Sequence, residues 1–125
     1  MLVRFLTSDD ETQAGQVYRV FRKAESEETM FFIPLLVVIE LIWVLESVYE
    51  IARNDILDSL TKLLQMPIFK FEHADALQPF IRSARNSRFD LPDLLIGESA
   101  RIQGCDAVLT FDRKASKSAL FERLG

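Results

Sequence analysis

The most constraining feature of this sequence is the apolar run Phe31–Leu45, which is interrupted only by Pro34 and Glu40. A helix that spans a bilayer needs about 20 apolar residues and tolerates a central carboxylate poorly. The run is shorter than that, so it indicates a buried strand that Pro34 ends, followed by a helix over Leu35–Arg53. Because this helix is apolar nearly all round, it is expected at the centre of a globular fold.

Strand and helix patterns alternate along the rest of the chain. Helical spacing starts after Ser8 or Asp9, either of which can cap the helix. The expected elements are a helix carrying Ala14, Val17, Tyr18 and Phe21, a strand over 29–33, a helix over 35–53, a helix from Asn54 or Asp55 to before Pro67, a strand over 68–71, a helix over 73–85, a helix over 92–103 followed by Gly104 in a left-handed conformation, a strand over 106–111, and a short helix from Lys114. This order predicts an α/β fold with a mainly parallel sheet covered on both faces. No repeat or linker divides residues 1–125, which are expected to form one domain.

Composition and charge narrow the class of protein. The single cysteine, Cys105, cannot form an internal disulfide, which is typical of the reducing cytoplasm. The net charge of −4 argues against a domain that binds nucleic acid through its overall electrostatic attraction. A local row of basic residues could still bind phosphates. The sequence therefore predicts a cytoplasmic globular domain without a membrane segment.

Glu40 is a single carboxylate among apolar neighbours. A buried lone carboxylate costs several kcal/mol, so it would have to be protonated, paired or bound to a cation. The alternative is a solvent-facing side chain on an otherwise buried helix. Both interpretations remain open for Glu40 on its own.

Three aspartates stand at the ends of predicted elements. Asp90 and Asp93 flank Pro92 at a helix start, and Asp112 comes directly after the strand that ends at Phe111. Each can be explained as a helix cap or a favourable partner of the helix dipole. Asp112 also stands at a carboxyl edge of the sheet, where open α/β folds bind ligands.

Together these carboxylates could hold Mg²⁺ or Mn²⁺, hard cations that prefer oxygen ligands. Such ions activate water and stabilise the oxygens of a phosphodiester displacement. Cationic residues lie along the same segments: Arg82, Arg85 and Arg88 at three-residue intervals, and Arg113, Lys114 and Lys117 after Asp112. They form either a phosphate-binding track or a solvated face.

These segments resemble the PIN-domain family, and in particular the VapC-like toxins of type II toxin–antitoxin pairs. The resemblance rests on Ile33-Pro34-Leu35, Val38-Ile39-Glu40-Leu41, Asp90-Leu91-Pro92-Asp93-Leu94-Leu95-Ile96-Gly97, Gly104-Cys105 and Leu109-Thr110-Phe111-Asp112. It implies a three-layer α/β/α sandwich and RNA cleavage that depends on Mg²⁺ or Mn²⁺.

The resemblance also assigns residue roles and partners. Glu40, Asp93 and Asp112 match the family's catalytic, metal-binding acids, Asp90 an auxiliary acid, and Thr110 a residue that orients a carboxylate or a water. The RNA-binding candidates are Arg82, Arg85, Arg88, Arg113 and Lys114. An antitoxin and a second copy of the chain are the expected protein partners, in the cytoplasm.

One departure from the family lies at Met1. Relatives of this kind open with a central strand that ends in Asp-Thr-Asn, and Met1-Leu2-Val3-Arg4-Phe5-Leu6 matches the segment directly after that strand. We therefore expect a PIN domain without its first central strand, either because residues precede Met1 or because the chain is a non-catalytic relic that binds RNA or an antitoxin. A third hypothesis is a structural α/β domain whose acids are only caps.

Overall fold

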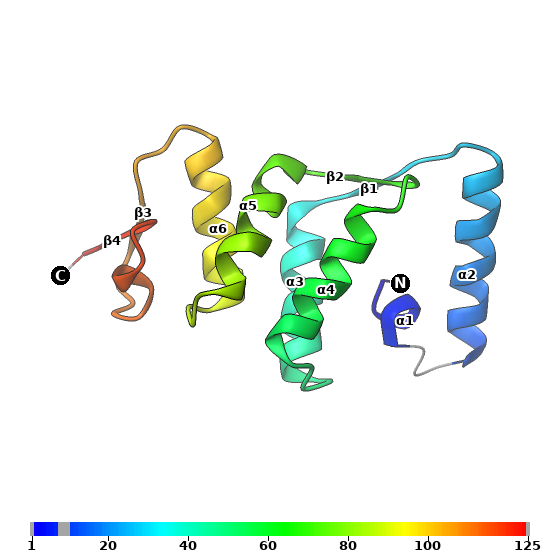
Figure 1. The fold of residues 1–125 in the computed structure, drawn as a ribbon, viewed down its shortest axis with the longest axis horizontal. Helices are drawn as coiled ribbons and strands as arrows, with labels where there is room; N and C mark the ends of the chain where they lie inside the picture. Colours follow the sequence, from blue (N-terminus) through cyan, green and yellow to red (C-terminus); the bar gives the residue numbers. More distant parts are fainter. Residues whose placement is uncertain (1, 8–10, 125) are drawn as a thin grey trace. The chain divides into compact units, whose positions relative to one another are not determined.

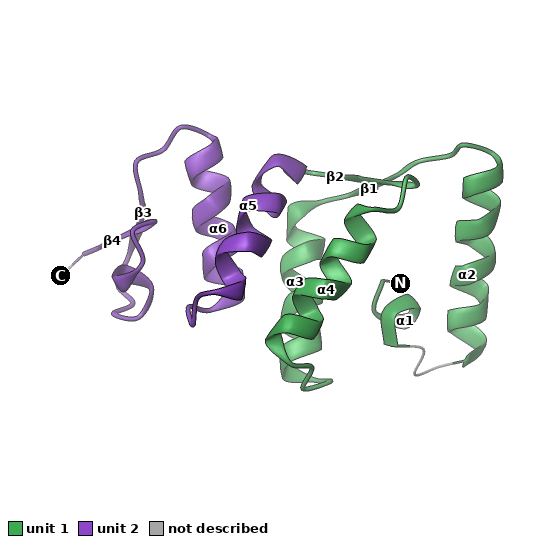
Figure 2. Cartoon of the chain, viewed as in Figure 1, with its two compact units in different colours: residues 1–72 green, residues 73–125 purple. Residues whose placement is uncertain are grey.

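The computed structural model describes residues 2–7 and 11–124, and the chain divides into two compact units, residues 1–72 and 73–125 (Figures 1 and 2). Unit 1 contains α1 (Leu2–Thr7), α2 (Glu11–Ser26), β1 (Phe31–Ile33), α3 (Leu35–Ser47), α4 (Arg53–Leu64) and β2 (Phe69–Phe71). Unit 2 contains α5 (Ala74–Arg85), α6 (Leu91–Ile102), β3 (Val108–Thr110), the 3₁₀ turn η1 (Ala115–Lys117) and β4 (Phe121–Arg123). The α/β class is as predicted, and a single domain over residues 1–125 stays a prediction.

The strands form two parallel pairs. β1 pairs with β2 in the register Phe31↔Phe69, and β3 pairs with β4 in the register Val108↔Phe121. Parallel pairing agrees with the sequence-based expectation. Within residues 2–7 and 11–124 the pairs make two separate two-stranded sheets, and each strand is bonded along one edge only.

The backbone of β1 shows which groups face its unbonded edge. The N–H of Phe31 donates to the carbonyl oxygen of Ile68 at 2.6 Å, and the carbonyl of Ile33 accepts from the N–H of Glu72 at 2.9 Å. Because alternate residues of a parallel strand turn their polar groups to the same partner, the N–H and C=O of Phe32 face away from β2. The Phe32 side chain is 57% exposed.

A cluster of phenylalanine rings holds the strand pair of unit 1 to its first two helices. The ring of Phe21 on α2 lies 5.0 Å from that of Phe5, 6.3 Å from that of Phe31 and 5.0 Å from that of Phe69, between centroids. Phe69 in turn contacts Phe71 at 6.0 Å. Phe21 is only 3% exposed. The pairs Phe5–Phe21, Phe21–Phe69 and Phe69–Phe71 are edge-on, an arrangement that adds to the stabilisation that burial of the rings supplies.

The helical pattern that begins near Ala14 corresponds to α2, which buries Phe21 and Ala24. Ser8 and Asp9, the alternative caps predicted for this helix, lie outside the described residues. The helix predicted after Asn54 is α4, and it buries the apolar face that the spacing indicated, namely Ile56, Leu57, Leu60 and Leu63.

The predicted end of the central helix is wrong. The sequence suggested a helix as far as Arg53, but α3 ends at Ser47. Glu50 adopts a left-handed conformation with φ 52°, and the N–H of Ile51 donates to the carbonyl of Leu45 at 2.9 Å. The reversal satisfies a carbonyl of the last turn, as left-handed helix ends commonly do, although glycine is the usual residue there.

In unit 2, α5 and α6 pack against each other, and the segment that leads into β4 lies close to α6. A Cβ added to Gly97 would come within 2.8 Å of the Leu120 Cβ and 3.1 Å of the Phe121 Cε2. Glycine at position 97 therefore permits this close approach. Gly104 has φ +83°, which confirms the predicted left-handed residue after the helix.

The predicted final helix is also wrong in part. The segment after Lys114 makes only the single 3₁₀ turn η1, and the chain then enters β4, a strand that the sequence did not predict. The crossover between β3 and β4 is short for a parallel pair, because such connections usually contain a dozen or more residues.

Candidate active site

The first part of the site is the start of α6. The Asp90 Oδ1 accepts a hydrogen bond from the backbone N–H of Asp93 at 3.1 Å, and Pro92 stands in the first turn. Asp90 is therefore the N-cap that local chemistry predicts, since it satisfies an otherwise unpaired N–H group. Asp93 lies in the first turn, where the helix dipole favours a negative charge.

The second part lies just after β3. The Thr110 Oγ1 accepts from the N–H of Asp112 at 3.0 Å. The Asp112 Oδ1 accepts from the N–H groups of Lys114 at 2.8 Å and Ala115 at 3.4 Å, and so caps the turn η1. Both capping bonds use one carboxylate oxygen of Asp112. No described residue donates to its other oxygen, so capping leaves that atom available to a ligand.

These three aspartates share one region of unit 2. The pKa of Asp93 is raised from its ordinary value of 3.8, first because partial burial disfavours the charged form, and then because the charges of Asp90 and Asp112 repel it. The two predicted segments, one at a helix start and one at a strand end, are thus brought within electrostatic reach of each other. A positive ligand would relieve this repulsion.

Glu40 belongs to unit 1. It lies on α3, is exposed, and lines an apolar hollow of about 180 Å³ together with Leu2, Val3, Val37, Leu41 and Val44. Of the two interpretations left open by the sequence, the structure supports the solvent-facing side chain. Burial therefore gives no reason to place Glu40 in the site, and its assignment rests on the family motif.

The donors that the site offers are carboxylate oxygens, which suit Mg²⁺ or Mn²⁺ better than a soft metal. Within residues 2–7 and 11–124, however, no three side chains of His, Cys, Asp or Glu are gathered closely enough to hold a metal ion. The chemistry of the donor set thus fits a hard cation, whereas the described positions do not assemble a complete coordination sphere.

The basic candidates fall into separate groups. Arg82 and Arg85 lie on α5 and are exposed, whereas Arg88 lies in the loop beyond the end of that helix. Arg88 therefore shares no helix with Arg82 and Arg85, because α5 ends at Arg85 as the sequence predicted. Arg113 and Lys114 are exposed beside Asp112.

One charged pair was not singled out from the sequence. Glu98 on α6 is buried, and its Oε2 accepts from Arg101 Nε at 2.9 Å and Nη2 at 2.7 Å. The spacing of three residues is a known signal for a helical ion pair. Nothing in the sequence indicated that Glu98 would be the buried member.

Helices alternate with parallel strands, and acidic residues stand at a helix start and after a strand end. These features describe an α/β domain with an acidic candidate site. The chain belongs to the PIN domain family, which it matches over residues 1–119. Among known proteins it is similar to a VapC ribonuclease from Aquifex aeolicus (strain VF5), with 29% identity over 123 residues that cover 94% of this chain and 86% of that protein. No solved structure matches the chain.

These comparisons confirm the resemblance to VapC-like PIN domains that the sequence motifs suggested. None of the helices in residues 2–7 and 11–124 has the length and apolar character that crossing a membrane requires.

Proposed function

We propose that this chain is a metal-dependent endoribonuclease, the toxin of a toxin–antitoxin pair. The observation that carries the proposal is the group of Asp90, Asp93 and Asp112 in unit 2, called the acidic group below. The charges of Asp90 and Asp112 help to raise the pKa of Asp93. In a PIN domain similar to a VapC ribonuclease, carboxylates of this kind are suited to serve as ligands of a divalent cation that acts on a phosphodiester, together with further ligands that complete the coordination.

In this proposal, which takes its ligands from the family motif, Glu40, Asp93 and Asp112 would hold Mg²⁺ or Mn²⁺, and Asp90 would be the auxiliary acid. When bound, such a cation lowers the pKa of a water and stabilises the attacking and leaving oxygens of the phosphodiester. Thr110 acts as a positioning residue, because its Oγ1 accepts the N–H of Asp112 and fixes the turn that presents the carboxylate.

The basic residues serve the polyanionic substrate. Arg113 and Lys114 adjoin Asp112 in the chain, and both are exposed. Together with Arg82, Arg85 and Arg88 they would contact phosphates, which positions a strand without reading its sequence. These contacts would be made locally, since the net charge of −4 supplies no overall attraction.

The test is cleavage of a labelled RNA by the full chain with Mg²⁺ or Mn²⁺. We expect activity that EDTA abolishes and that Asp93→Asn lowers by at least the roughly 10- to 100-fold that is typical when a residue around a metal site is removed. Asp75→Asn is the matched control, because Asp75 is exposed in the first turn of α5 and lies outside the acidic group. Equal activity of Asp93→Asn and the parent would contradict the proposal.

A second arm tests the first central strand. The chain would be extended before Met1 by an apolar strand that ends in Asp-Thr-Asn, the segment that the family resemblance predicts. We expect the extended chain to bind Mn²⁺ more tightly in calorimetry and to cleave faster. Equal Mn²⁺ affinity and equal rates for both chains would show that the added carboxylate is not part of the site.

A second candidate function is a non-catalytic PIN domain that binds RNA or an antitoxin. It is favoured by the fact that no three ligating side chains are gathered within the described residues, and by the capping roles of Asp90 and Asp112. It predicts RNA binding without cleavage in both the parent and the extended chain. It also predicts no difference in Mn²⁺ affinity between the parent and Asp93→Asn.

The protein partners we propose are a cognate antitoxin and a second copy of the chain, acting in the cytoplasm. Exposed apolar side chains on α3 support a protein interface: Leu36 is 64% exposed and Trp43 is 59% exposed. Light scattering of the purified chain tests the homodimer, and Trp43→Glu should shift it towards the monomer. A monomeric parent would remove the dimer from the proposal.

A further inference from the structure

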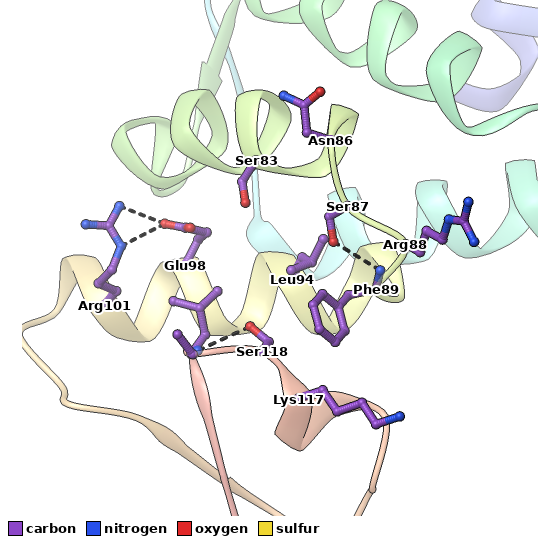
Figure 3. A pocket seen from close by; sticks show the side chains of 12 residues that line it. Ser83, Asn86, Ser87, Arg88, Phe89, Leu94, Glu98, Arg101, Lys117 and Ser118 are labelled. Atoms are coloured by element: carbon purple, nitrogen blue, oxygen red, sulfur yellow. Dashed lines mark hydrogen bonds and ion pairs between the residues drawn. The ribbon is translucent and has the colours of Figure 1, made fainter.

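Unit 2 contains an open pocket of about 590 Å³. Its walls come from the end of α5 with the loop after it, from one face of α6, and from the segment that joins η1 to β4 (Figure 3). It is lined by Ser83, Asn86, Ser87, Arg88, Phe89, Leu94, Glu98, Arg101, Lys117, Ser118, Ala119 and Leu120.

The charges of the lining leave the pocket positive. Its one carboxylate, Glu98, is already matched by two hydrogen bonds from Arg101. Arg88 and Lys117 are exposed, come from different walls, and make no side-chain hydrogen bond or ion pair with any residue of the described ranges. Two cations without a partner in a hollow surface are suited to an anionic ligand such as phosphate.

The remaining groups suit a nucleobase. The Oγ atoms of Ser87 and Ser118 accept from the N–H groups of Phe89 and Leu120, so both hydroxyl protons can still be donated to a ligand. The half-buried ring of Phe89 adds an apolar surface on which a base can stack.

Two more side chains complete the polar lining. The side chains of Ser83 and Asn86 also line the pocket, and they make no hydrogen bond to any residue within the described part of the chain. An amide and a hydroxyl are the groups that read the edge of an unpaired base.

The pocket and the acidic group share the same chain segments. Asp90 comes directly after Phe89 of the lining, and Asp93 directly precedes Leu94. Lys117 ends the turn η1 that Asp112 caps. These shared segments support a single RNA strand that contacts both the aspartates and the pocket.

We propose that this pocket binds one unpaired nucleotide of a single-stranded RNA, with its base against Phe89 and its flanking phosphates on Arg88 and Lys117. Ser83 and Asn86 contact the edge of the base and give the chain a base preference. This inference rests on the proposed function, because it supplies the subsite that selects where the strand is cut.

The experiment measures binding of a fluorescent single-stranded RNA to the full chain in EDTA, where no cleavage occurs. We expect Arg88→Ala/Lys117→Ala to weaken binding about 10-fold or more and to reduce the salt slope by about 1.4, since each phosphate contact on a single strand contributes roughly 0.7. The matched control is Arg19→Ala/Lys23→Ala, which removes the same charge from exposed positions of α2. Equal weakening in both double variants would overturn the subsite, because it would reflect net charge alone.

Two further arms sharpen the assignment. Ser83→Trp fills the pocket from an exposed position of α5 without changing charge, and it should weaken RNA binding while the melting temperature stays that of the parent. Asn86→Ala should reduce the difference in affinity among the four homopolymers. A mononucleotide that binds as tightly as the strand would overturn the assignment to RNA.

The subsite and the proposed function fail in different ways. Binding is measured without metal, so loss of binding in the Arg88/Lys117 variant supports the subsite whether or not the chain cleaves. Unchanged binding in that variant overturns the subsite while metal-dependent cleavage and its loss in Asp93→Asn can still stand.

Discussion

Both units have an apolar core, with Phe21 and Leu57 buried in unit 1 and Phe80 and Leu95 buried in unit 2, but they differ in the contacts that fix the ends of their elements. In unit 1, rings from α1, α2, β1 and β2 meet around Phe21, and the contacts are apolar. In unit 2, helix and turn starts are fixed by carboxylates, with Asp90 capping α6 and Asp112 capping η1. The acids of unit 2 can therefore have two roles, because a cap uses one carboxylate oxygen and leaves the other for a ligand.

The largest effect is expected at the phenylalanine cluster of unit 1. Phe21→Ala should lower the free energy of unfolding by about 3–5 kcal/mol, because it removes a buried ring that contacts three others. Urea denaturation followed by circular dichroism measures the loss. Tyr18→Ala on the same helix is the control, since Tyr18 is 53% exposed, and an equal loss there would show that the cluster is not special.

The next largest effect is expected at a helical glycine of unit 2, and a helical glycine of unit 1 serves as its comparison. Gly97→Ala should destabilise the protein by about 1–3 kcal/mol, because its Cβ would meet the Leu120 Cβ at 2.8 Å. Gly15→Ala on α2, where the nearest atom is the far end of Arg19 at 3.8 Å, should instead stabilise by about 0.5–1 kcal/mol. Thermal unfolding of each variant, compared with that of the parent, measures both changes in stability. Changes of the same sign would mean that the start of β4 does not press on α6.

A smaller effect is expected from the cap of α6. Asp90→Ala should cost about 1 kcal/mol, because the N–H of Asp93 loses its acceptor. Asp90→Asn should restore most of the stability, since the amide oxygen can also cap. Asp106→Ala serves as the exposed control before β3. If Asn failed to rescue, the charge rather than the hydrogen bond would stabilise the helix start.

The smallest effect concerns the charge of Asp93. Its folded-state pKa is raised above the ordinary 3.8, so ionisation of this group favours the unfolded chain once the pH rises above that value. Asp93→Asn should therefore be slightly more stable than the parent near neutral pH in EDTA, and the difference should vanish below pH 3.8. Melting temperatures over a pH series measure this. A constant difference at every pH would point to shape rather than charge.

Local chemistry explains which parts of the fold the sequence could predict. Pro34 ends a strand, Pro92 and Asp90 begin a helix, and Gly104 comes just after one, because each acts on its immediate neighbours. The end of α3 could not be predicted in this way. Glu50 has no intrinsic preference for the left-handed conformation that it adopts, so the reversal depends on packing.

The same distinction applies to the site. Asp90, Asp93 and Asp112 could be placed from the sequence, since each is defined by the end of an adjacent element. The exposure of Glu40 could not, because its apolar neighbours suggested burial whereas the side chain faces outward. The basic pocket brings together Arg88 and Lys117 from separate segments. Only the tertiary structure shows that they line one cavity.

The one-sided pairing of β1 has a consequence for amide hydrogen exchange. The N–H of Phe31 is bonded to Ile68, whereas that of Phe32 faces the free edge, so adjacent amides should exchange at very different rates. A segment that added to this edge would slow exchange at Phe32 and leave Phe31 nearly unchanged. Exchange at one residue thus reports whether the strand pair of unit 1 has gained a third strand.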